Sequence, residues 1–315
     1  MVGKYLKKNK NHIIISLLLA VFCVMVPYIV TRINMNDSRL KIYNPMKSGK
    51  YVIVPEEGKM DIEKFIPLSL YGIIPDGEIE SFDDETLKVM IVIIRTYINY
   101  KINEMGKNKN FIYADSLMMP YTSYEELEKK WGGNYEMKYN KIIKLINETD
   151  MENIYYNNVP IYPYYHEISS GMTNSGEYEY LKSVDSVDDI KADKYLKIMY
   201  FTPDNIKEKL NRYNKEINTD DINGKISVNK KENSEYVESV NVGEVKIDVE
   251  DWEKIFKIPS EAFDFETFSE GYKVTVKGKG SGIGLSIFGA GNMAKNGKNY
   301  KEILMHYYSG VEIKQ

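Results

Sequence analysis

The stretch DDETLKVMIVIIRTYINYKI, residues 83–102, carries the strongest helical pattern of this 315-residue chain. Its acidic start suits the positive end of a helix dipole, and apolar residues then recur at helical spacing. These apolar residues are Leu87, Met90, Ile91, Ile94 and Ile98. Val89, Val92 and Ile93 make the segment apolar nearly all round. Such a pattern predicts a helix that is central and buried.

Strand and helix signals alternate outward from this segment without the strict rhythm of a parallel sheet, which predicts an α+β fold that combines helices with antiparallel sheet. Further helices are expected after Ser123, where S-Y-E-E forms a capping box, and from Pro203 onward. The Asn-Asn pair at 157–158 predicts a hairpin turn, and residues 272–276 alternate as a strand does. The polar stretch 225–238 predicts a surface loop or insertion.

The composition is that of a folded protein, with 43% hydrophobic and 28% charged residues. The single cysteine, Cys23, lies in an apolar run, which excludes a disulfide framework and a thiolate metal site within the chain. The formal net charge is -4, and the first 12 residues are basic, so the rest of the chain is more acidic still. An acidic domain argues against nucleic acid as a partner.

Residues 13–30, IIISLLLAVFCVMVPYIV, carry no charge and are just long enough to cross ~30 Å of hydrocarbon as a helix. Lysines without acidic residues precede them, which predicts a cytoplasmic basic tail over 1–12. A cleaved signal peptide is the alternative, although no small-x-small cleavage site follows. We expect a single-pass protein of the cell membrane, with a stalk over 31–50 and one extracytoplasmic domain over 51–315.

Few residues are available for catalysis. Of the three histidines, His12 precedes the expected domain, and His166 and His306 have no carboxylates at spacings that predict a metal site. His306 lies within a helical pattern and is expected to be structural. The glycine stretch near residue 280 is not G-x-G-x-x-G, so it does not predict a dinucleotide site. No cofactor is expected.

Carboxylate chemistry on sugars remains, because one carboxylic acid kept protonated by an apolar wall can protonate a glycosidic oxygen. Asp76, Glu78 and Glu80 follow an apolar run and are the candidates. The chain also has 27 tyrosines, and several crowd together: Tyr155, Tyr156, Tyr162, Tyr164 and Tyr165. Aromatic faces suit sugar rings, but the same tyrosines would equally fill a half-buried sheet.

Four blocks follow one another in the order of a known family. They are YGII, ESF and LKVMIVIIRTYINYK at 71–101; NETDMENIYYNNVPIYPYYHEISSGMT at 147–173; YLKSVDSVDD and YFTPDNIKEKL at 180–210; and GSGIGLSIFGAGNMAKNG and YKEILMHYYSGVEI at 280–313. Together they resemble the stage II sporulation protein D family, also called the amidase-enhancer family, over nearly the whole exported part.

This resemblance implies a membrane-anchored cell-wall protein that acts in engulfment during sporulation. Family members are lytic transglycosylases, in which one glutamate protonates the bond after N-acetylmuramic acid and then acts as a base while the 6-hydroxyl closes a 1,6-anhydro ring. The expected partners are peptidoglycan glycan strands and other membrane-anchored sporulation wall hydrolases. The implied glycan-binding cleft would be lined by Tyr165, His166, Ser169, Ser170, Gly171, Thr173, Gly280, Ser281, Gly282 and Gly284.

The chain departs from the family at the sites of chemistry. Laid on residues 72–82 without gaps, the family's catalytic glutamate falls on Gly77. Glu78 is next, and a one-residue bulge, which glycine tolerates, would return a glutamate to the cleft. At 280–289 the family's histidine, glutamine and tyrosine hydroxyl are missing. Two functions therefore stay open: a divergent lytic transglycosylase with Glu78 as acid and base, and a catalytically degenerate glycan-binding or scaffolding relative.

Three features also allow a structural interpretation. The glycines at 280–284 would let backbone approach a glycan or a neighbouring strand, but they would also suit a tight turn and close helix packing with no ligand. Arg95 follows an apolar helical run, so its burial would require a carboxylate partner, for which Glu78 and Asp76 are the expected candidates. The family pattern implies that His166, beside a Ser-Ser-Gly turn, is a cleft residue, and a core histidine is the alternative.

Overall fold

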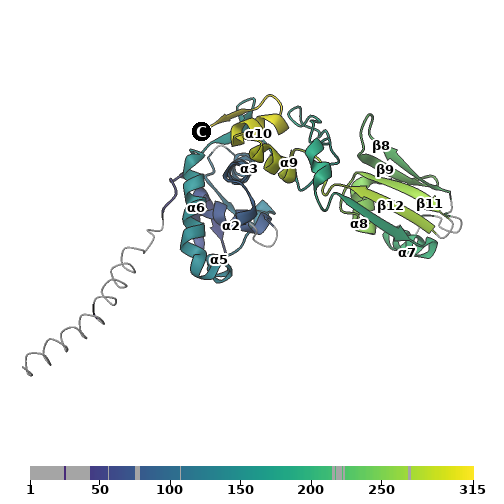
Figure 1. The fold of residues 1–315 in the computed structure, drawn as a ribbon, viewed down its shortest axis with the longest axis horizontal. Helices are drawn as coiled ribbons and strands as arrows, with labels where there is room; N and C mark the ends of the chain where they lie inside the picture. Colours follow the sequence, from purple (N-terminus) through teal and green to yellow (C-terminus); the bar gives the residue numbers. More distant parts are fainter. Residues whose placement is uncertain are drawn as a thin grey trace, which may run out of the picture.

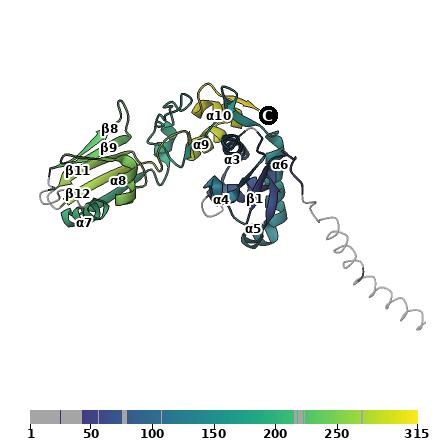
Figure 2. The same ribbon diagram turned by 180° about the vertical axis from the view of Figure 1, so that it is seen from behind.

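The computed structural model describes residues 25, 43–55, 57–74, 79–106, 108–214, 217, 222, 224–268 and 271–315. Two lobes joined by a narrow neck are visible from both sides (Figure 1 and Figure 2). The first lobe comprises residues 43–195 and 278–315, and the second comprises residues 196–277. Each lobe has its own cluster of buried hydrophobic side chains. At the neck, the backbone N–H of Gly278 donates to the carbonyl oxygen of Tyr195 at 2.7 Å.

The first lobe is built around the predicted central helix, α3 (Asp84–Glu104). Leu87, Ile91, Ile94 and Ile98 are fully buried there, which confirms the prediction from the apolar pattern. Helices α2 (Ile62–Ile73), α6 (Tyr135–Glu148), α9 (Ile287–Lys295) and α10 (Tyr300–Tyr307) contact α3 from different sides. Figure 1 shows α3 nearly end-on among them.

Short sheets and helices complete the first lobe. β1 (Tyr51–Val54) lies between antiparallel β2 (Gly58–Asp61) and parallel β3 (Phe111–Tyr113). β4 (Asn153–Tyr156) lies between β5 (Val159–Pro160) and β14 (Glu312–Lys314), and β6 (Tyr165–His166) pairs with β13 (Leu285–Ser286). The remaining helices are α4 (Ala114–Leu117), α5 (Tyr124–Trp131) and the 3-10 turns η2 (Ile79–Ser81), η3 (Gly132–Asn134) and η4 (Val187–Lys191).

Local signals placed several elements correctly. Ser123 caps α5 by accepting from the backbone N–H of Glu126. Asn157 and Asn158 have φ of 51° and 61°, so a tight turn joins β4 to β5 as the Asn-Asn pair predicts. Thr202 caps α7 (Pro203–Tyr213) in the same way as Ser123 caps α5.

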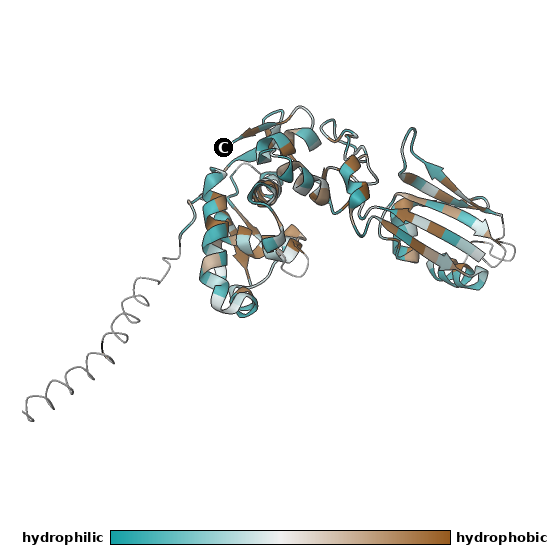
Figure 3. Ribbon diagram, viewed as in Figure 1, coloured by the Kyte–Doolittle hydropathy of each residue, from teal (hydrophilic) through white to brown (hydrophobic). Residues whose placement is uncertain are grey.

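The second lobe contains two antiparallel sheets with strand orders β11-β12-β7 and β10-β9-β8. Their strands are β7 (Leu196–Phe201), β8 (Ile226–Lys230), β9 (Val237–Val242), β10 (Val245–Asp248), β11 (Phe263–Phe268) and β12 (Gly271–Lys277). Brown and teal bands alternate along these strands, as expected where one face is buried (Figure 3). Trp252 and Phe256 of α8 (Val249–Phe256) and Leu210 of α7 are buried in this lobe's hydrophobic cluster.

The expectation of a surface loop or insertion over 225–238 is wrong about the loop, while the segment does lie within the lobe that is inserted between Tyr195 and Gly278. Residues 226–230 form β8, which pairs with β9 so that Val228 lies opposite Val240. Only Ile226 and Val228 pack against the hydrophobic cluster, because a strand with one buried face needs an apolar residue only at every second position. Two such residues among polar ones give too weak a pattern to separate a strand from a loop.

The predicted basic tail and most of the predicted transmembrane segment and stalk lie outside the described residues. None of the helices that the structure describes is long and apolar enough to cross a membrane. The last part of the expected stalk, residues 43–50, belongs to the first lobe and contacts α6. There the backbone N–H groups of Tyr43 and Met46 donate to the side chains of Asn140 and Asn147 on α6.

Candidate functional site

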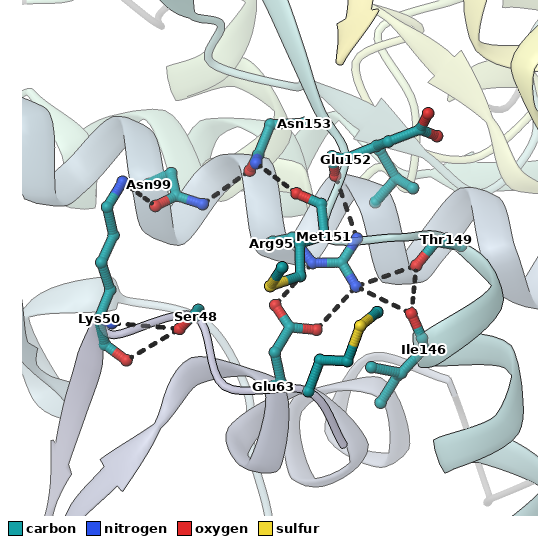
Figure 4. A network of polar contacts seen from close by, with 12 residues as sticks. Ser48, Lys50, Glu63, Arg95, Asn99, Ile146, Thr149, Met151, Glu152 and Asn153 are labelled. Atoms are coloured by element: carbon teal, nitrogen blue, oxygen red, sulfur yellow. Dashed lines mark hydrogen bonds and ion pairs between the residues drawn. The ribbon is translucent and has the colours of Figure 1, made fainter. Parts of the chain in front are cut away.

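Arg95 is buried in the first lobe, and its carboxylate partner is Glu63 (Figure 4). Nε and Nη2 of Arg95 lie 2.7 and 2.8 Å from the two carboxylate oxygens, and both side chains are at most 1% exposed. Nη2 also donates to Thr149 Oγ1, and Nη1 donates to the carbonyl oxygen of Glu152. The expectation that Asp76 or Glu78 pairs with Arg95 is therefore wrong.

The polar network around this pair ties α3 to three other parts of the first lobe. Asn99 accepts from Lys50 Nζ at 2.6 Å and donates to Asn153 Oδ1 at 2.7 Å (Figure 4). Asn153 in turn donates to the carbonyl oxygen of Met151. These groups satisfy one another, so the arrangement holds α2, α3 and β4 together within the first lobe.

Glu78, with Asp76, lies outside the described residues, between α2 and η2. The residues on either side are described. A Cβ on Gly72 would lie 2.7 Å from the backbone of Pro120, so α2 ends packed against the Pro120 segment. Glu80, the third candidate, forms an ion pair with Lys138 and is 66% exposed, so it lacks the apolar surroundings that keep a carboxylic acid protonated.

A pocket of about 160 Å³ lies between α3, the Met118–Pro120 segment and the chain before β6. We call it the tyrosine pocket, because its lining includes Tyr97, Tyr162, Tyr164 and Tyr165 together with Met118 and Pro120. Pro120 is the residue against which Gly72 packs, so the pocket adjoins the end of α2. Burial raises the pKa values of Tyr97 and Tyr165, so both hydroxyls stay protonated; the Tyr97 hydroxyl donates to the carbonyl oxygen of Leu117.

The tyrosines continue beyond the pocket as a chain of ring contacts. The ring centroid of Tyr162 lies 5.3 Å from that of Tyr97 and 4.3 Å from that of Tyr164. The ring centroids of Tyr164 and Tyr178 are 6.4 Å apart. Tyr178 stacks almost parallel on Tyr180 with centroids 5.2 Å apart, while its other side is partly exposed. The sequence indicated the crowding at 155–165 but not Tyr97 or Tyr178, which join it only through the fold.

His166 is buried, at 4% exposure, so the expectation of a cleft residue is not met. Its Nδ1 lies 3.1 Å from the carbonyl oxygen of Ile283, which can only accept, so Nδ1 carries the proton. Nε2 is buried and has no partner among the described residues. Burial lowers the pKa of His166 to about 4, and the ring is therefore neutral at neutral pH.

The other predicted residues of the second block separate into two groups. Ser169 and Thr173 are buried and bonded to backbone: Ser169 Oγ accepts from Gly171, and Thr173 Oγ1 accepts from Val184. Ser170 and Gly171 instead line a second cavity of about 630 Å³ with Asp185 and Glu235. Since Tyr165 lines the tyrosine pocket, the predicted substrate-binding residues do not share one cavity.

The glycines of the fourth block are required by close packing. Gly280, Gly282 and Gly284 all have positive φ, between 74° and 100°. A Cβ on Gly282 would lie 2.1 Å from the Tyr236 ring, and one on Gly284 would lie 2.0 Å from the carbonyl oxygen of Tyr164. Ser281 accepts from the Asn174 side chain through its carbonyl oxygen. The alternative in which the glycines serve a tight turn and close packing therefore accounts for these positions.

Asp189 joins the second and fourth blocks, and sequence reasoning missed it. Its Oδ2 accepts from the backbone N–H of Ser169 and from the hydroxyl of Ser286, each at 2.6 Å. Ser286 also caps α9 by accepting from Gly289. Burial raises the pKa of Asp189. Nothing in the sequence distinguishes this aspartate from its neighbours, because its partners come together only in the folded chain.

Glu261 is a second carboxylate that the sequence did not single out. It lies at the neck, 6% exposed, and its Oε2 is 3.4 Å from Asn174 Nδ2. Burial raises its pKa to about 7, while Lys231, which donates to Asn174 Oδ1, opposes that rise. Among the residues that the structure describes, no group of three or more His, Cys, Asp or Glu side chains could hold a metal ion.

Comparison with known proteins gives three similar sequences, whereas no family model matches the chain. The stage II sporulation protein D of Bacillus subtilis is 29% identical over 265 residues, covering 79% of this chain and 75% of that protein. Its counterpart from Bacillus amyloliquefaciens is 29% identical over 262 residues, with the same coverage. An uncharacterized protein of Brachyspira hyodysenteriae is 28% identical over 282 residues, covering 84% of this chain and 71% of that protein.

Proposed function

We propose that this chain, a divergent relative of the stage II sporulation protein D family, is a cell-wall protein of spore formation that binds peptidoglycan glycan strands at the tyrosine pocket. The observation that carries the proposal is the pocket's lining. Tyr97, Tyr162, Tyr164 and Tyr165 supply apolar ring faces, on which the C–H faces of a sugar can stack, and the protonated hydroxyl of Tyr165 can donate to the sugar's oxygens.

Binding is tested by sedimentation with insoluble, purified peptidoglycan. The variant Tyr165→Ala should leave more protein in the supernatant than the unmodified chain does. Tyr113→Ala is the matched control, because Tyr113 is 54% exposed and does not line the pocket. Equal binding by both variants would place glycan recognition elsewhere on the molecule.

We further propose that Glu78 cleaves the bound strand as acid and then base. Glu78 would protonate the bridging glycosidic oxygen as its bond to C1 breaks, and the resulting carboxylate would then take the proton of the sugar's 6-hydroxyl as that oxygen bonds to C1. The products are a 1,6-anhydro sugar end and a new free hydroxyl, and no water is consumed. Two observations support the assignment: Gly72, near Glu78 in sequence, packs beside the tyrosine pocket, and Arg95 is already paired with Glu63.

The cleavage test is digestion of purified peptidoglycan followed by mass spectrometry for 1,6-anhydro products. Glu78→Gln should abolish these products, whereas Glu80→Gln and Glu261→Gln should retain them. Glu80 is the exposed neighbour in sequence, and Glu261 is the buried carboxylate with a pKa of about 7. Loss of product in Glu261→Gln with full activity in Glu78→Gln would reverse the assignment.

The second candidate function is a glycan-binding or scaffolding relative without catalysis. It is favoured by Gly77 at the place of the family's glutamate and by Ser281, Ile287 and Phe288, which stand where the family has a histidine, a glutamine and a tyrosine. In that case, the chain should bind peptidoglycan through the tyrosine pocket and release no anhydro product. A soluble anhydro fragment made by the unmodified chain would exclude it.

We propose residues 13–30 as the membrane anchor of this protein, with the lobes outside the cytoplasm and other sporulation wall hydrolases as partners. In intact cells, protease added from outside should degrade the lobes, and the chain should fractionate with membranes. Replacing residues 13–30 by a cleavable signal peptide should move the lobes to the soluble exported fraction. Recovery of the unmodified chain in the cytosol would contradict this placement.

A further inference from the structure

Strand β7 forms an open edge of the second lobe. In the sheet order β11-β12-β7 it is the last strand, and among the described residues β12 is its only strand partner. Edge strands expose unpaired backbone N–H and C=O groups, and proteins usually protect them with charged side chains, proline or a covering element. β7 has the sequence LKIMYF, which contains one lysine and no proline.

The exposed face of β7 is apolar. Leu196, Ile198 and Tyr200 are 55%, 48% and 66% exposed, and they alternate along the strand and therefore share one face. Met199 and Phe201, on the opposite face, pack against the hydrophobic cluster of the second lobe. The strand is thus apolar on both faces although only one is covered, which is unusual for an antiparallel sheet with one solvated side.

The pairing with β12 fixes which backbone groups are free. The Gly278 N–H donates to the carbonyl oxygen of Tyr195, so Tyr195 and alternate residues after it face β12. The backbone groups of Leu196, Ile198 and Tyr200 consequently point outward, away from the sheet. The residues with exposed apolar side chains are the same residues that can form hydrogen bonds with an added strand.

We propose that β7 pairs antiparallel with β7 of a second copy of this chain, about a two-fold axis at Ile198. Ile198 then lies opposite Ile198 of the other copy, and Leu196 lies opposite Tyr200, so each of the three exposed apolar side chains gains an apolar cross-strand neighbour. Lys197 lies opposite Met199, and no like charges meet. The two three-stranded sheets join into one continuous sheet, with the same patch on both copies, as a two-fold interface requires.

The neighbouring two-fold registers fit less well. An axis at Lys197 places that lysine opposite itself, which like-charge repulsion disfavours. An axis at Met199 places Leu196 opposite Thr202, which precedes α7 and caps it, so the apolar row loses a partner. A pairing of five residues from each strand covers little area, so the dimer is expected to be weak, and covalent trapping is the suitable measurement.

The test uses the full chain in detergent micelles with Cys23→Ser, so that introduced cysteines are the only thiols. Directly opposed, hydrogen-bonded residues have Cα atoms about 5.5 Å apart, which is within the range of a disulfide. Ile198→Cys should therefore give a covalent dimer under mild oxidation, seen on a non-reducing gel. Leu196→Cys should not, because its own copy lies four residues further along, roughly 13 Å away.

Two further measurements fix the register. A mixture of Leu196→Cys and Tyr200→Cys chains should form the mixed disulfide, whereas neither variant alone should give a covalent dimer. Adding Ile198→Lys to both should abolish the mixed disulfide, because two lysines would then face each other. Absence of dimer with Ile198→Cys, or equal dimer with Ile198→Cys and Leu196→Cys, overturns the proposal, and in the second case a different contact between copies must explain the crosslinks.

Discussion

Arg95 and Glu63 show what a buried ion pair requires at the scale of single residues. Both side chains are at most 1% exposed, and two charge-assisted hydrogen bonds join them in the parallel geometry that arginine favours. Thr149 and the carbonyl oxygen of Glu152 satisfy further guanidinium N–H groups. These bonds offset the desolvation of the two buried charges. Removing only one partner leaves the other charge buried and unpaired, which destabilises the folded chain.

Replacing Arg95 by leucine should lower the free energy of unfolding by roughly 3–5 kcal/mol, because Glu63 would be left as an unpaired buried charge. The measurement is equilibrium unfolding in urea. Lys101→Ala, which removes an exposed pair with Glu104, is the control and should cost less than about 1 kcal/mol. Equal losses in the two variants would mean that the pair is not what holds α2 on α3.

His166 should make stability depend on pH. Burial lowers its pKa to about 4 in the folded chain, against 6.5 as its ordinary value. Between these values the unfolded chain binds a proton that the folded chain does not. The free energy of unfolding should therefore fall as pH falls, by about 1.4 kcal/mol per pH unit from this group.

The pH effect of His166 is isolated by comparing the chain with His166→Gln at about pH 7 and about pH 5. Asp189 and Glu261 have raised pKa values, so each contributes the opposite slope, but they are common to both proteins. At each pH, the urea midpoint of the variant is subtracted from that of the unmodified chain. This difference should be smaller at the lower pH than at the higher one, or become negative. A difference that is independent of pH would show that His166 keeps a normal pKa.

At the scale of elements, the glycine stretch before α9 is set by what approaches it. Gly282 and Gly297 have similar φ, 74° and 84°, yet only Gly282 has a neighbour, the Tyr236 ring. Gly282→Ala should cost roughly 3 kcal/mol, from left-handed strain together with the clash, whereas Gly297→Ala should cost roughly 1 kcal/mol from strain alone. Thermal unfolding of both variants measures the difference, and similar losses would mean that Tyr236 moves aside freely.

The sequence was sufficient to predict those elements whose signal lies within a few neighbouring residues. The apolar pattern of α3, the caps Ser123 and Thr202 and the turn at Asn157-Asn158 are each complete within a few residues, and the structure confirms them. It was insufficient for β8, where two apolar residues on one buried face leave almost no periodic signal.

The candidate site shows the same division. The tyrosines at 162–165 were visible as a crowd, and they do line a pocket. The partner of Arg95 was not visible, because Glu63 lies 32 residues away in sequence and meets Arg95 only where α2 packs on α3. The burial of His166 is equally a tertiary effect, since it depends on the pairing of β6 with β13 and on Gly280 lying against the histidine's Cβ.

At the scale of the whole molecule, the second lobe is an insertion in the first. The chain leaves at Tyr195 and returns at Gly278, and these two residues are hydrogen-bonded to each other. The contacts across the neck are mainly polar or involve a single ring: Tyr236 bonds to the Ser170 N–H and the Met172 carbonyl, and Asn174 bonds to Glu261. Two separate hydrophobic clusters joined in this way should be only weakly coupled in unfolding.

The two tryptophans allow that coupling to be measured, because Trp131 is buried in the first lobe's cluster and Trp252 in the second's. In Trp131→Phe, fluorescence reports the second lobe, and in Trp252→Phe it reports the first. Leu210→Ala, in α7, should lower the free energy of unfolding of the second lobe by about 2–5 kcal/mol, because it leaves a cavity in that lobe's cluster alone.

The urea midpoint reported by Trp252 should therefore fall clearly with Leu210→Ala, while the midpoint reported by Trp131 should change little. Leu68→Ala, fully buried in the first lobe, is the matched control and should reverse the pattern. If either substitution shifts both midpoints equally, the neck transmits the full loss and the two lobes unfold as one cooperative unit. Weak coupling, by contrast, would let the second lobe open without unfolding the lobe that carries the tyrosine pocket.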